Sequence, residues 1–190
     1  WPIIKTKFMN EGFATLVHQK VIDQLVREKL MTLPEHADYN YANSLVKADP
    51  ILTLNPYTIG CGIWKDIEDR WNRGRHGSDW DECNNAKDKK EWDKNTQKGF
   101  SKCVDVVKTY VDWFFIQEFL TVDLVKDLGI YLYGVRDAGS KVEAVVTKET
   151  AKEIKDQLVG AFAQSSLPTI DVVNGNCGNM GRLLLEHRWD

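Results

Sequence analysis

The apolar positions of the first 30 residues repeat at the spacing of an α-helix. A helix running from about residue 7 or 10 to residue 29 or 30 would place one set of side chains on a common seam: Glu11, Ala14, His18, Val21 and Leu25. We expect the protein core to cover this seam. Burial of a carboxylate and an imidazole is costly unless each is hydrogen-bonded, paired or bound to a metal, so we expect other polar groups to meet them.

A second helix is predicted from about residue 55 to Trp71. Asn55 followed by Pro56 is a favourable start, because Asn caps a helix well and Pro suits its first position. Gly60 and Gly62 lie inside this helix, where each costs about 1 kcal/mol relative to Ala. Such a cost favours close approach of another backbone, and the Glu11 helix is the candidate.

The remaining helical pattern is less regular. Residues 34–43 are predicted to be a connection followed by a short helical turn at 42–47, and residues 72–99 a solvated loop with one or two short helices. One long helix is expected over 96–119, with Asp112 beside its apolar seam, either paired with a cation or close to a polar site. A short helix then stops before Gly129.

After Gly129 the pattern changes to alternation. Strands are predicted at 130–135, 142–146, 169–173 and 182–187, and Thr150 with Glu153 forms a capping box that opens a helix after the second strand. The expected fold is therefore α+β, with a helical domain at 1–127 and a small β-β-α-β-β module with a mostly antiparallel sheet at 128–190. The glycine-rich stretch 174–181 is expected to be a hairpin connection rather than a phosphate loop.

Charge and composition narrow the classes of function. A net charge of −3 and a pI of about 5.9 argue against a general nucleic-acid or anionic-membrane surface. No apolar run approaches the ~20 residues of a membrane span. The four cysteines are irregularly spaced, which favours reduced thiols and a cytoplasmic location over a disulfide framework.

Candidate chemistry centres on Glu11 and His18. The simpler interpretation is a buried pair satisfied by backbone groups or by a Lys or Arg, and the alternative is a metal site, such as one for zinc, completed from elsewhere. Six further residues are expected to be structural or to support that site: Asn10 as the helix cap, Thr15 as a donor to the Glu11 carboxylate, Asn55, Tyr57, Asp66 and Asp112. Tyr57 could reach Glu11 or His18, and Asp66 should pair with Arg70.

Several blocks resemble one known family. Residues 7–18 resemble the Asn-Glu-Gly-aromatic-Ala-x-x-x-His motif of the stage V sporulation protein R (SpoVR) family, and residues 55–60 its Asn-Pro-Tyr-x-x-Gly. Residues 112–120 are similar to its Asp-x-x-Phe-Ile-x-x-Phe-Leu, and residues 181–187 to its closing segment. The blocks keep the family's order over nearly the whole chain. The resemblance is to the C-terminal portion of an archaeal-like subtype.

The resemblance implies two functional hypotheses. In the first, the protein has a non-catalytic regulatory or assembly role in spore-cortex formation or stress response, beside a serine protein kinase and its partner protein, with the β-β-α-β-β module as the docking part. In the second, Glu11 and His18 join histidines of a missing N-terminal half in a metal-dependent, zinc metallopeptidase-like hydrolase, and this fragment alone would be inactive. Many relatives carry His where Asn43 stands here, which removes one potential ligand. The remainder of the SpoVR chain is a further expected partner, and nucleic acid and membrane are not.

Overall fold

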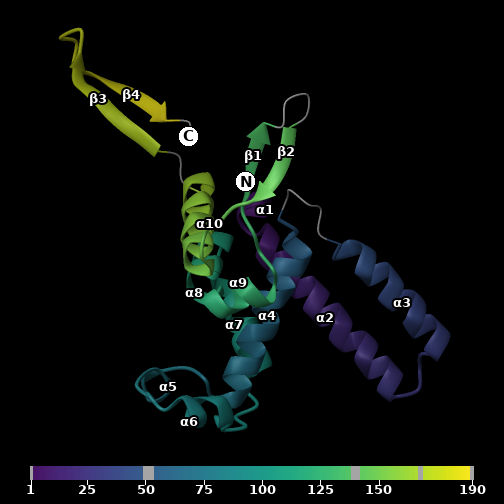
Figure 1. Cartoon of the computed structure of the whole chain (residues 1–190). Helices are drawn as coiled ribbons and strands as arrows, with labels where there is room; N and C mark the ends of the chain where they lie inside the picture. Colours follow the sequence, from purple (N-terminus) through teal and green to yellow (C-terminus); the bar gives the residue numbers. More distant parts are fainter. Residues whose placement is uncertain (1, 49–53, 138–141, 167–168, 189–190) are drawn as a thin grey trace.

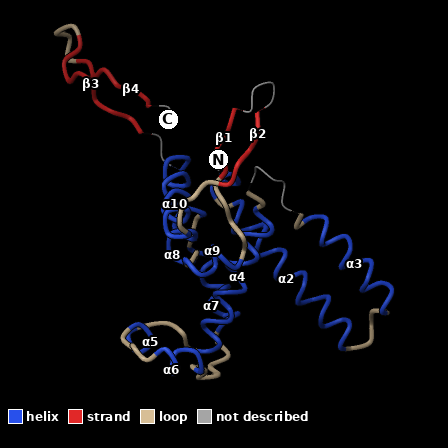
Figure 2. Tube along the Cα trace, in the orientation of Figure 1, coloured by secondary structure: helices blue, strands red, loops and turns tan. Residues whose placement is uncertain are grey.

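Helices build most of the chain, and two antiparallel hairpins flank the last helix (Figures 1 and 2). The computed structural model describes residues 2–48, 54–137, 142–166 and 169–188. Its helices are α1 (Pro2–Lys5), α2 (Lys7–Arg27), α3 (Leu33–Val46), α4 (Pro56–Arg73), α5 (Ser78–Asp81), α6 (Ala86–Glu91), α7 (Gly99–Thr109), α8 (Asp112–Phe119), α9 (Val122–Asp127) and α10 (Ala151–Ser166). Its strands are β1 (Tyr133–Asp137), β2 (Val142–Val146), β3 (Thr169–Cys177) and β4 (Arg182–Arg188).

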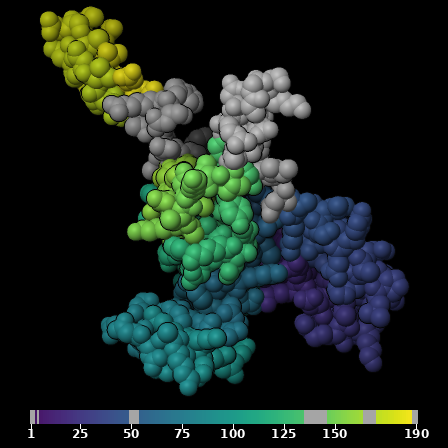
Figure 3. All heavy atoms as spheres, in the orientation of Figure 1, coloured from purple at the N-terminus to yellow at the C-terminus, as the bar shows by residue number. Residues whose placement is uncertain are grey.

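The C-terminal elements follow the predicted β-β-α-β-β order but do not form the predicted single sheet. Among the described strands β1 pairs only with β2 and β3 only with β4, both antiparallel. The hairpin β3–β4 stands away from the helices in Figures 1 and 3. The expectation of one sheet was wrong because alternation along a strand predicts a pleated, half-buried segment and says nothing about which neighbour it pairs with. The division into domains at residue 127 stays a prediction, and Ile154 and Leu158 of α10 belong to the same hydrophobic core as the earlier helices.

Helix α4 is the centre of that core. Its side chains Ile63, Trp64 and Ile67 are fully buried, and α2, α7 and α8 pack around them. Cys103 of α7 and Phe115 of α8 are also fully buried. No helix within the described ranges is both long and apolar enough to cross a bilayer.

The contact between α2 and α4 is a backbone-to-backbone crossing. A Cβ added to Gly12 would lie 2.3 Å from the carbonyl carbon of Gly60, and one added to Gly60 would lie 2.1 Å from the carbonyl oxygen of Phe8. Both distances are far below van der Waals contact, so only glycine allows the two helices to approach this closely. The close approach predicted for Gly60 is confirmed, and its partner is the helix that carries Glu11. The same prediction was wrong for Gly62, where an added Cβ would meet the Leu128 side chain instead of another backbone.

This crossing also fixes which face of α2 is buried. The buried residues of α2 are Met9, Gly12, Thr15, Leu16 and Ile22. The predicted seam through Glu11 and His18 is not the core face: His18, Ala14 and Val21 are exposed, and Glu11 is half-buried. The expectation failed because α2 carries apolar residues on two adjacent seams, and the glycine-mediated crossing selects the other one.

Helix α3 replaces the predicted connection at 34–43. The Thr32 side chain accepts a hydrogen bond from the Glu35 backbone N–H, and the Glu35 carboxylate accepts one from the Thr32 backbone N–H at 2.8 Å. This reciprocal pair is a capping box, and Pro34 lies in the first turn, where proline is tolerated. The prediction of a connection was therefore wrong, and the sequence signal that it overlooked was Thr-Leu-Pro-Glu.

The predicted helix at 96–119 is divided into α7 and α8. Tyr110 and Val111 have extended backbone, with φ of −101° and −120°, and separate the two helices. As a result Asp112 lies in the first turn of α8 and faces the start of α2. The single-helix prediction was wrong because helical spacing continues across the break even though the helix axis does not.

The charge-rich segment between α4 and α7 holds the two short helices α5 and α6, as expected. It is nevertheless firmly attached: the Arg75 guanidinium donates to the carbonyl oxygens of Trp92 at 3.0 Å and Lys90 at 3.2 Å, and the Trp92 indole donates to the Gly74 carbonyl at 3.0 Å. Gly74 ends α4 in the left-handed region at φ +68°. Four free cysteines are present (Cys61, Cys83, Cys103 and Cys177), as the sequence predicts.

Candidate functional site

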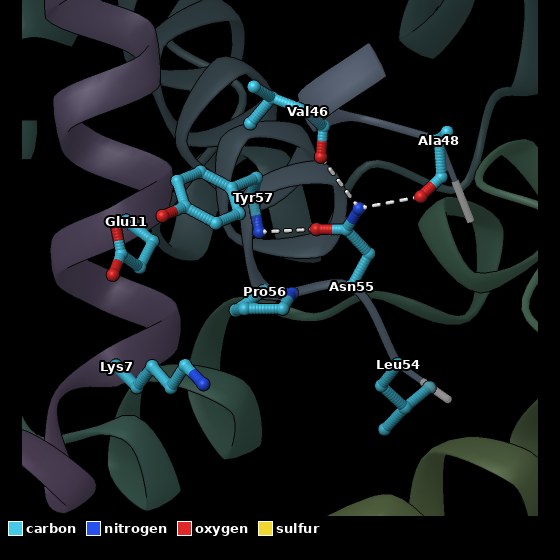
Figure 4. A pocket seen from close by; sticks show the side chains of 8 residues that line it. All are labelled: Lys7, Glu11, Val46, Ala48, Leu54, Asn55, Pro56 and Tyr57. Atoms are coloured by element: carbon cyan, nitrogen blue, oxygen red, sulfur yellow. Dashed lines mark hydrogen bonds between the residues drawn. The ribbon is translucent and has the colours of Figure 1, made fainter. Parts of the chain in front are cut away.

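A surface cleft of about 430 Å³ opens where α2, the end of α3 and the start of α4 meet (Figure 4). Its polar lining consists of Lys7, Glu11, Asn55 and Tyr57, and its apolar lining of Val46, Ala48, Leu54 and Pro56. Three of the residues that the sequence singled out, Glu11, Asn55 and Tyr57, are thus brought together. This cleft is the candidate site of the described chain.

Asn55 holds the cleft wall together where the end of α3 meets the start of α4. Its side-chain oxygen accepts from the backbone N–H groups of Tyr57 at 2.9 Å and Thr58 at 3.4 Å, which caps α4 as predicted. Its side-chain nitrogen donates to the carbonyl oxygens of Val46 and Ala48, both at 3.0 Å. Because Asn55 uses donors and acceptors at once, it ties the end of α3 to the start of α4 and leaves little freedom in the cleft wall.

Glu11 and Tyr57 face each other across the cleft. Figure 4 shows the phenol of Tyr57 pointing to the Glu11 carboxylate, and their hydrogen bond is the main cause of a raised pKa for the Tyr57 phenol. The hydrogen bond favours the protonated phenol, and the negative charge on Glu11 opposes its ionisation. Lys7 lines the same cleft but extends away from the Glu11 carboxylate in Figure 4. The site therefore offers one carboxylate, one phenol and one ammonium group to a visiting ligand.

Asp112 positions the helix that carries Glu11. The side chain is only 2% exposed, and its carboxylate accepts from the backbone N–H groups of Phe8 and Met9, each at 2.9 Å. Burial raises the pKa of Asp112, and the backbone N–H groups at the start of α2 oppose that rise. Asp112 thus caps α2 from a different helix, whereas Thr6, at the N-cap position, makes no side-chain capping bond.

Trp64 completes this support from α4. Its indole N–H donates to the Met9 carbonyl oxygen at 3.0 Å, and the side chain is fully buried. Sequence reasoning did not assign a role to Trp64 or to Lys7. The one available signal was that Trp64 lies four residues after Gly60, on the side of α4 that meets α2.

Other predicted residues take different roles. Asn10 lies inside α2 and donates to the Thr6 hydroxyl at 2.9 Å, so the prediction that Asn10 caps the helix was wrong. The Thr15 hydroxyl donates at 2.7 Å to the Glu11 backbone carbonyl rather than to its carboxylate. The expected bond to the carboxylate is therefore also wrong, since a hydroxyl four residues along a helix reaches the preceding carbonyl more directly.

Asp66 and His18 lie outside the cleft. Asp66 pairs with Arg70 at 2.7 Å as expected, and burial raises its pKa while Arg70 lowers it. His18 is exposed, and its ring contacts the Tyr39 ring of α3 with centroids 5.0 Å apart. The structure does not bring His18 to Glu11, because the two residues are separated by about 10.5 Å along α2.

The described residues do not form a metal site on their own. They contain no group of three or more His, Cys, Asp or Glu side chains placed to hold an ion. Glu11 and His18 would each need ligands from elsewhere, and the Tyr57 phenol points to the Glu11 carboxylate. The zinc site inferred for the longer family members stays a prediction.

Comparison with known proteins identifies the chain's relatives. A family model described as "SpoVR like protein" matches residues 1–167. The uncharacterized protein YcgB of Escherichia coli (strain K12) is 24% identical over 193 residues, which cover 92% of this chain and 34% of that relative. The chain therefore spans about a third of the length of the curated relative that it matches. No solved structure matches.

Proposed function

The chain belongs to the SpoVR-like family, and on that premise we propose that it acts as a non-catalytic assembly protein that docks a protein partner on helix α3. The proposed setting is spore-cortex formation or stress response. Two finer points belong to the same proposal: the chain corresponds to the C-terminal portion of a longer family member, and it is of an archaeal-like subtype.

The observation that carries the proposal is the orientation of α3. Leu33, Ala37, Tyr41 and Leu45 repeat every four residues and make one stripe, and all are exposed, with Leu33, Tyr41 and Leu45 at 78%, 69% and 60%. No residue of this 14-residue helix is buried. An apolar stripe directed at solvent is the feature by which amphipathic helices enter grooves on partner proteins.

The opposite side of α3 is polar and half-buried. Its residues His36, Tyr39 and Asn43 are half-buried, and Tyr39 packs on His18 of α2. The Tyr39 hydroxyl is buried and has no hydrogen-bond partner among the described residues. The usual arrangement, with the apolar side inward and the polar side outward, is thus reversed in α3. Figure 1 shows α3 together with the far half of α2 projecting from the rest of the helices.

The partner that we propose is the serine protein kinase beside which the family is expected to act, together with the partner protein of that kinase. An assembly role needs a protein-binding surface, and the α3 stripe supplies one. The metal-dependent hydrolase remains an untested hypothesis about the longer family members. The structure adds no support to it, because the described part of the chain provides only two of its ligands and separates them.

The test is a quantitative binding assay with the kinase and its partner protein from the same source organism. The double variant Tyr41→Glu/Leu45→Glu places two charges on the stripe and should weaken binding at least tenfold. Ala42→Glu is the matched control, because Ala42 is exposed on α3 but lies off the stripe. Circular dichroism should show equal helix content in both variants.

The variant Glu11→Ala separates the assembly proposal from a role of the cleft in binding. Glu11→Ala should leave kinase binding unchanged if the role is assembly. Loss of binding in Glu11→Ala, with the α3 double variant binding normally, would reject the assembly proposal, as would the absence of any binding by the unmodified chain.

A further inference from the structure

The hairpin β3–β4 has one apolar and one more polar face. The register pairs Ile170 with His187 and Val172 with Leu185. Side chains two residues apart share a face, so Leu183 joins Leu185 on the same side. The exposed fractions of Ile170, Val172, Leu183 and Leu185 are 54%, 61%, 63% and 54%. An apolar face of this kind on an isolated hairpin calls for further strands or a covering element.

The other face carries charged side chains of both signs. Asp171 lies directly opposite Glu186 in the register, and like charges in this position destabilise an antiparallel pair. Arg182 lies on the same face as Glu186, four residues earlier in β4, which is too far along a strand for a direct pair. Neither Arg182 nor Glu186 has an ion-pair partner among the described residues.

The outer edge of β4 is the part of the hairpin that can pair with a further strand. Among the described strands β4 pairs only with β3, so its other edge presents unpaired backbone N–H and C=O groups. This edge contains no proline, and the central residues are Leu183, Leu184 and Leu185. Edges of this composition accept an additional strand readily.

We propose that two copies of this chain associate through their β4 edges, antiparallel and related by a two-fold axis at Leu184. The result is a four-stranded antiparallel sheet with the order β3–β4–β4–β3. Three or more strands with a shared apolar face are the size at which a sheet gains independent stability, which a lone hairpin lacks. A two-fold axis makes the contact self-complementary and closed, so it stops at the dimer.

Charge complementarity together with the overlap of the three leucines favours this register. With the axis at Leu184, Arg182 of each copy lies opposite Glu186 of the other, and Leu183 lies opposite Leu185 on the apolar face. Each Glu186 is then flanked by Asp171 within its own copy and by Arg182 from the second copy. An axis one residue later, at Leu185, would place Glu186 opposite Leu184 and lose both ion pairs. Pairing two β3 edges about Asp171 would place two carboxylates opposite each other.

The test is sedimentation equilibrium of the full chain and of charge-reversal variants. The unmodified chain should be a dimer. Arg182→Glu alone and Glu186→Arg alone each create two like-charge contacts across the axis and should raise the dimer dissociation constant at least tenfold.

Recombination of the charges separates the proposal from a general folding defect. An equimolar mixture of the two single variants should form a heterodimer, because both cross-axis pairs are restored, and the double variant Arg182→Glu/Glu186→Arg should dimerise as the unmodified chain does. A monomeric unmodified chain, single variants that dimerise normally, or a mixture that stays monomeric would each overturn the proposal. The Tyr41→Glu/Leu45→Glu variant of α3 should still dimerise, so failure of this inference is distinct from failure of the proposed function.

Discussion

Replacing Asp112 with Ala tests the junction that holds the start of α2. The variant removes the acceptor for the backbone N–H groups of Phe8 and Met9 and leaves them without a partner in a buried place. Hydrogen bonds to a charged acceptor contribute about 1.5–3 kcal/mol each. The carboxylate also pays a desolvation cost that the variant recovers, so we expect a net loss of roughly 2–4 kcal/mol in the free energy of unfolding.

Urea unfolding followed by circular dichroism measures this loss. For a chain of this size a loss of roughly 2–4 kcal/mol should lower the urea midpoint by about 1–2 M. Asp123→Ala is the matched control: Asp123 also lies in the first turn of a helix, but its side chain is 89% exposed and pairs only with Lys126. The control should change the free energy by less than about 0.5 kcal/mol. Equal midpoints for the two variants would refute the capping role of Asp112.

The pH dependence of the free energy of unfolding gives a second test of Asp112, and the direction of the change is predicted. Burial raises the pKa of Asp112 above its usual value of 3.8, so the folded protein binds this proton more readily than the unfolded chain does. The free energy of unfolding contributed by this group is therefore largest at low pH and falls as the pH rises from about 3.8 through the folded pKa. The free energy of unfolding of the unmodified chain minus that of the non-titrating variant Asp112→Asn should therefore be larger near pH 4 than at pH 7. A constant difference over this range would contradict the raised pKa.

Three further predictions follow from the packing. Gly60→Ala should lower the free energy of unfolding by more than about 2 kcal/mol in thermal or urea unfolding, because its Cβ has no room against α2. Gly160→Ala is the control: it lies in a helix with nothing within 4 Å and should raise the free energy of unfolding by about 0.5–1 kcal/mol. The Cys103 thiol, whose pKa burial raises to about 12, should resist a thiol reagent at pH 8 until the protein unfolds, and a rate equal to that of free cysteine would exclude its burial. Glu11→Gln should lower the pKa of the Tyr57 phenol in an ultraviolet titration, and an unchanged titration would show that the two groups do not interact.

Local signals in the sequence predicted several contacts correctly. Asn55 with Pro56 begins α4, Thr150 and Glu153 form a capping box, and Asp66 pairs with Arg70. The close approach at Gly60 was also predictable, because a glycine inside a helix is unfavourable unless a neighbouring backbone needs the space. These predictions succeed because each depends on residues within a few positions of one another or on a single steric requirement.

The site itself was predicted only in part. Tyr57 points to Glu11, one of the two partners suggested for it, and Asn55 lines the same cleft, but His18 lies elsewhere because α2 turns its glycine face to α4. The role of Asp112 depends on the break between α7 and α8, which places a residue more than 100 positions away in sequence at the start of α2. Periodicity along one segment carries no information about such a contact.

The crossing of α2 and α4 at Gly12 and Gly60 has a mechanical consequence for the far half of α2, which projects together with the α3 stripe. No side chain separates the backbones of Gly12 and Gly60, so α2 contacts α4 directly at this point, and Asp112 anchors the first turn of α2. The 16 residues from Gly12 to Arg27 then form a lever about 22 Å long, with its fulcrum at the crossing. A partner that tilted this lever by about 10° would move its tip by about 4 Å and leave Glu11, one residue from the crossing, almost in place.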